Sequence, residues 1–213
     1  MNTALYIISA VIAYVIGSIS FSEIFAKKLM NEDITQVGSG NAGTTNMLRS
    51  YGWKLGLLTL ACDLLKGVAA VLIARAIGGE TAGYIACVFA VVGHKWSCFM
   101  HFKGGKGIAT TTGVLLVVNP LPTLIIFAVC VFIVYLTKIM SIGSIIGVIS
   151  SAVVPFILMP DNHGLQLAAV IICVITLYAH RENIVRLAHG TENKLSMRHG
   201  EDNGGSEKDS RRE

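Results

Sequence analysis

Long apolar runs separated by short basic loops are the feature that most limits how this chain can fold. Only 14% of its 213 residues are charged, against about a quarter in an average soluble domain. A helix needs roughly 20 mostly apolar residues to cross a bilayer. The runs that meet or approach this length are Leu5–Phe25, Leu55–Ile77, Leu121–Leu136, Ser141–Met159 and Leu165–Ala179. Two shorter runs, Ala82–Val92 and Ile108–Val118, bring the predicted number of spans to about seven.

The continuity of these runs excludes a β-barrel, whose strands alternate apolar and polar residues. We therefore predict an all-α integral membrane bundle that forms one polytopic domain over residues 1–196. A polar tail of mixed charge, residues 197–213, is predicted to be disordered. The first run lacks a basic segment before it, so we interpret it as a retained helix rather than a signal peptide.

The distribution of Lys and Arg predicts the orientation of the bundle. With seven spans, one set of loops is basic, with Lys27, Lys28, Arg49, Lys54, Lys95, Lys103, Lys106, Lys138, Arg181 and Arg186. The loops of the other side, Gly78–Thr81, Asn119–Pro122 and Pro160–Gly164, contain no Lys or Arg. The positive-inside rule then places the N-terminus outside and the C-terminus, with every glycine-rich loop, in the cytoplasm.

The first unusual loop, Val37–Arg49, combines three glycines with amide and hydroxyl side chains and ends in an arginine. Its members are Gly38, Ser39, Gly40, Asn41, Gly43, Thr44, Thr45, Asn46 and Arg49. Successive N–H groups in a glycine turn can bind an anion, and a guanidinium suits a phosphate. The alternative is a flexible linker followed by a helix capped by Thr44 or Thr45. We favour a ligand-binding loop.

The second loop, within Gly93–Thr112, surrounds Lys106 with Gly104, Gly105 and Gly107. If the apolar run after it is a helix, the N–H groups at the start of that helix form a phosphate site. The pattern is not a Walker A loop, which argues against nucleotide hydrolysis. Lysines that only set topology on anionic lipid are the alternative, and they leave the glycines unexplained.

The third polar cluster, Tyr178–Asn193, follows the last apolar run with helical spacing. His180 and Asn183, and Arg186 or Leu187 beyond them, are predicted to share one helix face. A structural histidine is the simpler interpretation of this cluster when it is taken alone. Its value comes from lying on the same predicted side as the other two loops.

Asp63 and Lys66 lie three residues apart inside the second apolar run. Charges within a span are costly and usually face the bundle interior or a functional cavity. A structural ion pair and a functional pair are both consistent with this spacing.

Together these motifs resemble the acyl-phosphate:glycerol-3-phosphate acyltransferases of bacterial phospholipid synthesis. The matching stretches are Gly38–Arg49, Gly93-His94, Asp63 and Lys66, Phe102–Thr110, and His180–Leu187 with Gly190 and Glu192. The chain departs from that pattern at Trp96-Ser97, where the family usually has a proline, and at Ala179, where it commonly has arginine.

The resemblance implies transfer of a fatty acyl group from acyl phosphate to the 1-hydroxyl of glycerol 3-phosphate, giving lysophosphatidate and phosphate. It also implies a bacterial plasma membrane with the active site at the cytoplasmic face. By motif, the catalytic residues are Arg49, Lys106, His180 and Asn183. These four bind substrate together with Ser39, Gly40, Asn41, Asn46, Gly104, Gly105 and Gly107.

The proton acceptor is left open: His180 is one candidate, and an oxygen of the acyl phosphate, which we prefer, is the other. No cluster of His, Cys or carboxylates has metal-ligand spacing, so we expect neither metal nor cofactor. We also expect a monomer in contact with membrane lipid and without a nucleic-acid partner.

One rival function is an acyltransferase with a different acyl donor, and another, a transporter, belongs to a different class. A thioester-dependent acyltransferase often has His-x-x-x-x-Asp, yet no His here is followed by Asp at that spacing. An organophosphate transporter fits the glycine-broken segments, but the chain has no internal repeat and its polar clusters gather on one predicted side. A purely structural membrane protein leaves the glycine loops unexplained.

Overall fold

The computed structural model describes residues 2–195, and within that range the chain forms helices and no strand. The elements are α1 (Asn2–Ser18), α2 (Phe21–Phe25), α3 (Thr44–Tyr51), α4 (Trp53–Lys95), α5 (Ile108–Val118), α6 (Pro120–Thr137), α7 (Met140–Leu158), α8 (His163–Ala179) and α9 (Arg181–Ala188). Short helical turns cover Ala26–Met30, Ile34–Gln36 and Cys98–Met100. The predicted disordered tail, residues 197–213, lies outside the described residues.

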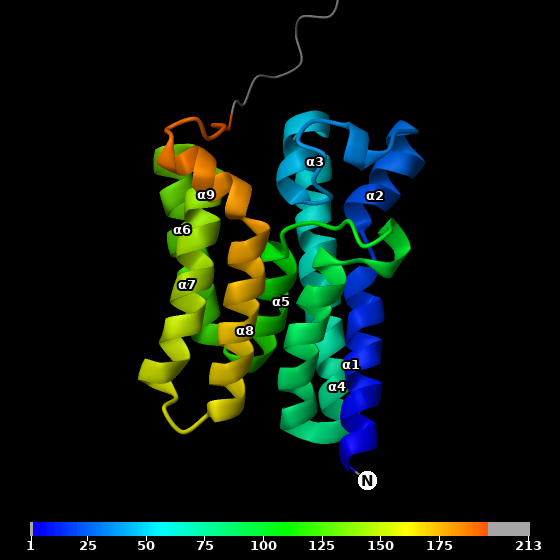
Figure 1. Cartoon of the computed structure of the whole chain (residues 1–213), viewed down its shortest axis with the longest axis vertical. Helices are drawn as coiled ribbons and strands as arrows, with labels where there is room; N and C mark the ends of the chain where they lie inside the picture. Colours follow the sequence, from blue (N-terminus) through cyan, green and yellow to red (C-terminus); the bar gives the residue numbers. More distant parts are fainter. Residues whose placement is uncertain (1, 196–213) are drawn as a thin grey trace, which may run out of the picture.

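Helix α4 is a hairpin of two helices rather than one straight rod. Gly78 and Gly79 have non-helical backbone angles, and Gly79 has a φ of 73°, which favours glycine. The second half runs back beside the first (Figure 1), so that Lys66 lies against His94, with Nζ 2.9 Å from Nδ1. These halves correspond to the two predicted runs on either side of Gly78–Thr81.

Four helical stretches are long and apolar enough to cross a membrane: Thr3–Met30, Trp53–Met100, Pro120–Thr137 and Met140–Leu158. Helices α8 and α9 add a fifth if they count as one span despite the 61° bend between them. Helix α5 is shorter. A helical membrane bundle is therefore confirmed, whereas the count of seven spans and their orientation stay predictions.

The first span, which we predicted as one continuous helix, contains a break. Helix α1 stops at Ser18 instead of continuing to Phe25, and a new helix begins after Ser20. Two carbonyls at the break are bound by side chains from α4 and the loop after it. Lys66 donates to the Ile19 carbonyl at 2.5 Å, and Ser97 donates to the Ser18 carbonyl at 2.6 Å. These bonds replace the helical ones that the continuous pattern predicted.

Small residues let the helices approach closely. A Cβ on Gly17 of α1 would collide with the Ala90 backbone, and one on Gly67 would collide with the Thr110 carbonyl. Such contacts are typical of membrane bundles, where packing rather than the hydrophobic effect joins the helices.

All three polar clusters lie at one end of the bundle, opposite the N-terminus (Figure 1). Helices α3 and α9 are at this end, and the segment before α5 crosses the bundle beneath them. The three loops that lack Lys and Arg are at the other end. The fold thus gathers residues from distant parts of the sequence into one place.

Candidate active site

A single cavity of about 530 Å³ opens at the polar end of the bundle. Its polar lining includes Ser39, Asn41, Thr44, Thr45, Asn46, Arg49, Gly105, Lys106, Gly107, His180, Asn183, Arg186 and Glu192. Among the predicted site residues, only Gly40 and Gly104 do not line it. The four predicted catalytic residues therefore face the same space.

The first loop is shaped by Asn46, which is buried under it. The Asn46 side chain accepts from the Ser39 N–H at 2.9 Å and donates to the carbonyls of Val37 at 2.8 Å and Ile34 at 3.3 Å. Gly40, with a φ of 68°, completes the turn. Because its amide is committed to the loop, Asn46 supports the site rather than offering free donors to it.

Helix α3 begins at the cavity without a side-chain cap. Gly43 occupies the N-cap position, so the alternative in which Thr44 or Thr45 caps the helix is wrong. The Thr44 hydroxyl is buried and has no hydrogen-bond partner within the described part of the chain. The first N–H groups of a helix lack intrahelical partners and attract anions, so this helix start is suited to a phosphate.

Helix α5 begins at the same cavity and also lacks a side-chain cap. Its N-cap is Gly107, with a φ of 84°. The turn before it lies tightly against α4, since Gly104 and Gly105 donate to the carbonyls of Lys95 at 3.0 Å and His94 at 3.2 Å. A side chain at Gly104 would collide with the His94 backbone. The predicted helix Ile108–Val118 is thus present, and it begins at the glycine turn without a side-chain cap.

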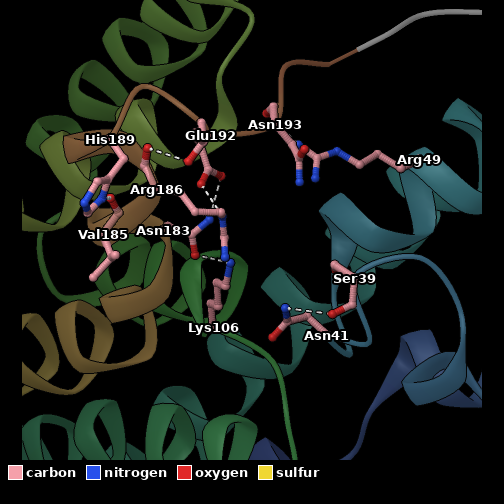
Figure 2. A network of polar contacts seen from close by, with 11 residues as sticks. Ser39, Asn41, Arg49, Lys106, Asn183, Val185, Arg186, His189, Glu192 and Asn193 are labelled. Carbon is pink, nitrogen blue, oxygen red and sulfur yellow. Dashed lines mark hydrogen bonds and ion pairs between the residues drawn. The ribbon is translucent and has the colours of Figure 1, made fainter.

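Lys106 is fixed by a chain of polar contacts from α9 and the segment after it (Figure 2). Its ammonium donates to the Asn183 side-chain oxygen. The Asn183 nitrogen donates to Glu192 at 2.7 Å, and Arg186 Nε donates to the other Glu192 oxygen at 2.8 Å. The Glu192 side chain is only 5% exposed. The sequence prediction that Asn183 and Arg186 share a face is confirmed.

Burial lowers the pKa of Lys106 to about 8, against the opposing charge of Glu192, which raises it. The Glu192 carboxyl is partly desolvated, which raises its pKa. Its hydrogen bonds from Asn183 and Arg186 outweigh this, so its pKa lies below the ordinary value. The pair is therefore ionised at neutral pH, with an ammonium that loses its proton more easily than a free lysine.

His180 lies at the bend between α8 and α9 and is 2% exposed. Its Nδ1 is 2.8 Å from the Thr176 carbonyl, which can only accept, so Nδ1 carries the hydrogen. Burial lowers the His180 pKa to about 4. The neutral ring therefore keeps a lone pair on Nε2, which suits it to accept a hydrogen bond from a hydroxyl.

Arg49 faces this network from the opposite wall, on α3 (Figure 2). It is exposed, and its Nη2 donates to the Asn193 carbonyl at 2.9 Å. The segment that carries Glu192 and Asn193 thus touches both walls of the cavity. Ser39 and Asn41 lie on the α3 wall below Arg49.

The cavity continues from this polar mouth into an apolar groove between α5, α6 and α7. Its apolar lining includes Leu115, Ile126, Phe127, Val131, Val134 and Val148. A charged head group at the mouth and an alkyl chain along the groove would satisfy both parts of this space.

Sequence reasoning did not assign Glu192, Arg186 or Ser141 to the site, although all three line the cavity. Glu192 appeared only within the matched motif, and Arg186 only within that motif, on a helix face and as a basic loop residue. Ser141 begins an apolar run, and nothing in that run indicated a functional residue.

Comparison with known proteins agrees with the geometry. The family model for glycerol-3-phosphate acyltransferase matches residues 7–190. The glycerol-3-phosphate acyltransferase of Clostridioides difficile (strain 630) is 45% identical, with 91% of this chain and 97% of that protein covered. The one from Thermoanaerobacter sp. (strain X514) is 43% identical, with 90% and 96% covered.

Two crystal structures of PlsY (YgiH), an integral membrane glycerol 3-phosphate acyltransferase, have the same fold. The glycerol 3-phosphate form superposes with a TM-score of 0.84 at 36% identity, covering 90% of this chain and 96% of that one. The lysophosphatidic acid form gives 0.82 at 35%, covering 90% and 95%. This chain belongs to the glycerol-3-phosphate acyltransferase family, as an integral membrane enzyme.

Proposed function

We propose that this acyltransferase uses acyl phosphate as its donor and acylates the 1-hydroxyl of glycerol 3-phosphate. The products are 1-acylglycerol 3-phosphate (lysophosphatidate) and inorganic phosphate. The observation that carries the proposal is the pair of uncapped helix starts, α3 and α5, that meet at one cavity beside Lys106 and Arg49. Two phosphate-bearing substrates need two such anion sites.

Glycerol 3-phosphate is water-soluble, so we assign it to the mouth of the cavity. Arg49 and Lys106 stand on opposite walls there and are suited to hold its phosphate between them. Ser39 and Asn41 add neutral donors on the α3 wall. Asn183 and His180 lie on the other wall, where they can orient the glycerol hydroxyls.

The acyl phosphate carries a fatty chain, so its alkyl part fits the apolar groove between α6 and α7. Its phosphate would then lie against the glycine turn and the start of α5. Relatives crystallised in glycerol 3-phosphate and lysophosphatidic acid forms support an acceptor and a product of these kinds.

In the proposed reaction the 1-hydroxyl oxygen attacks the acyl carbonyl carbon. The bond from that carbon to the phosphate oxygen breaks, and phosphate leaves with the electron pair. Two like charges at about 4 Å repel by about 4 kcal/mol at an effective dielectric of 20. Arg49, Lys106 and the two helix starts offset this repulsion, and alignment of the reactants can contribute roughly 7–11 kcal/mol.

The hydroxyl proton is best accepted by an oxygen of the leaving phosphate. His180, with a pKa of about 4, is a weak base. Its free Nε2 can instead accept the hydrogen bond of the glycerol hydroxyl and hold the oxygen in line. We therefore assign to His180 the orientation of the glycerol hydroxyl, and to the acyl phosphate the acceptance of its proton.

We place this site at the cytoplasmic face of the bacterial plasma membrane, in a monomer. The basic loops at the polar end support this orientation. It is tested with Asp161→Cys and Lys194→Cys in intact cells. Only the first, at the end opposite the site, should react with a membrane-impermeant thiol reagent.

The donor is tested with the purified full chain, glycerol 3-phosphate and either acyl phosphate, acyl coenzyme A or acyl carrier protein. We expect lysophosphatidate and phosphate in equal amounts with acyl phosphate alone. Product from a thioester alone would overturn the proposed donor. Lys106→Ala controls for uncatalysed acyl transfer, and uptake of glycerol 3-phosphate into proteoliposomes without product would favour a transporter.

A further inference from the structure

A buried trio of Asp63, Lys66 and His94 lies beneath the active-site cavity and is not used by the proposed chemistry. The side chains are 2%, 3% and 6% exposed, respectively. All three belong to α4, and the hairpin brings His94, from its second half, against the other two. Asp63 and His94 also line the cavity.

Lys66 is the centre of the trio. Its ammonium is 2.7 Å from the Asp63 carboxylate, 2.5 Å from the Ile19 carbonyl and 2.9 Å from His94 Nδ1. An ammonium has hydrogens to donate and no lone pair, so Lys66, which is ion-paired with Asp63, donates to both the Ile19 carbonyl and His94 Nδ1. His94 Nδ1 is therefore unprotonated, and the hydrogen of the neutral ring must be on Nε2.

That Nε2–H has no hydrogen-bond partner among residues 2–195. The ring edge that carries it faces the glycine turn around Lys106. A Cβ built on Gly105 would collide with His94 Nε2, and one on Gly107 would lie 3.9 Å from His94 Cδ2. Because His94 lines the cavity, an N–H that has no protein partner there is available to a ligand.

We propose that His94 is a further substrate-binding residue, whose Nε2–H donates to a phosphate oxygen held at the floor of the cavity. Lys66 and Asp63 are positioning residues that fix its tautomer. The floor lies inside the bundle, away from the exposed Arg49, so the phosphate bound there is that of the membrane-side substrate. This assignment of the phosphate to acyl phosphate rests on the proposed donor.

Two substitutions separate the role of the His94 Nε2–H group from the contact between His94 Nδ1 and Lys66. His94→Asn places an oxygen near the Nδ1 position for Lys66 but removes the reach of Nε2. His94→Gln keeps an N–H near Nε2 and gives up the Nδ1 contact. We expect the KM for acyl phosphate to rise about 10- to 100-fold in His94→Asn and less in His94→Gln, while the KM for glycerol 3-phosphate changes less than about twofold.

A purely structural role gives the opposite order. If Lys66 needed only an acceptor, His94→Asn would keep full activity, and His94→Gln would lose thermal stability with both KM values affected. That outcome would overturn the inference.

A spectroscopic readout on the wild-type chain works even if the variants do not fold. With ¹⁵N-labelled histidine, His94 should give the correlation pattern of an Nε2–H tautomer. A long-chain 2-oxoalkylphosphonate, in which methylene replaces the bridging oxygen, should move that proton downfield, and the matching uncharged methyl ketone should not. An Nδ1–H tautomer, or no response to the phosphonate, contradicts the proposal.

The two proposals can fail separately. If wild-type protein makes no product from acyl phosphate but the phosphonate moves the His94 signal, the donor is wrong and the phosphate contact stands. If product forms but neither the signal nor the KM for acyl phosphate responds, His94 does not bind the phosphate.

Discussion

The two cationic walls of the cavity are prepared very differently. Lys106 is half-buried and held by Asn183, which donates to Glu192, and Arg186 holds Glu192 in turn. Arg49 is exposed and binds one backbone carbonyl, that of Asn193. One cation is therefore positioned before substrate arrives, whereas the other must exchange a protein contact for the phosphate. Positioning in advance favours catalysis, and an exposed guanidinium favours capture of a soluble anion.

Removing Lys106 should have the largest effect. We expect Lys106→Ala to lower kcat by about 10²–10³-fold, because it deletes a fixed charge that offsets the repulsion between the two phosphate groups during the reaction. Lys106→Arg should recover little, since the wider guanidinium does not fit between Asn183 and the glycine turn. Steady-state kinetics and circular dichroism on the same samples check both statements; a kcat within threefold of wild type would mean that the two walls do not differ.

Removing Arg49 should mainly weaken capture. Arg49→Ala is expected to raise the KM for glycerol 3-phosphate about 10- to 100-fold, the usual loss for one charged hydrogen-bonding group, with a smaller fall in kcat. Arg49→Lys keeps the charge and is the matched control. An equal fall in kcat for Arg49→Ala and Lys106→Ala would contradict the proposal that Lys106 mainly serves catalysis and Arg49 mainly serves binding.

Replacing His180, which lies on the same wall as Lys106, tests whether its Nε2 lone pair acts as a base or only accepts a hydrogen bond. Glutamine can present an acceptor near Nε2 but cannot act as a base, so we expect His180→Gln to keep about a tenth of wild-type kcat. A loss as large as that of Lys106→Ala would instead identify His180 as the base. Single-turnover rates at saturating glycerol 3-phosphate make the comparison.

The smallest expected effect is on the pH profile. Because the pKa of Lys106 is about 8, the ammonium that binds phosphate is lost as pH rises through that value. We therefore expect kcat/KM for glycerol 3-phosphate to fall above pH 8, since this ratio reports the free enzyme. Glu192 raises the Lys106 pKa by its charge, so Glu192→Gln should move this fall to lower pH.

Lys106→Arg is the control for that profile, because an arginine does not titrate in this range. If its residual activity shows the same fall above pH 8, another group is responsible. Arg49→Lys, on the other wall, should leave the midpoint close to its wild-type value, because its charge is exposed and screened.

Several features could be predicted before the structure was known. The extent of α5, Ile108–Val118, and the turn at Gly78–Thr81 follow from hydropathy and glycine placement. The gathering of the three polar clusters at one end followed from counting spans and charges. The break in the first span was not predicted, because the pattern from Leu5 to Phe25 gives no sign that Lys66 and Ser97 bind carbonyls there.

Within the site, the role of a residue followed from its position in the fold more than from its type. Asn46 and Asn183 are both asparagines in polar motifs, yet Asn46 is used to shape a loop and Asn183 contacts the catalytic lysine. Glu192 was quoted only as part of a motif, although it anchors that wall.

The sequence by itself determined that this chain is a helical membrane protein with anion-binding loops at one end. That information is local, since the need to satisfy backbone groups in lipid and the freedom of glycine act within short segments. Only the tertiary structure decided which hydrogen-bond donors remain free for substrate. Hydrogen bonds between residues far apart in sequence occupy some polar groups and leave others facing the cavity. Lys66 with His94 and Arg49 with Asn193 are examples.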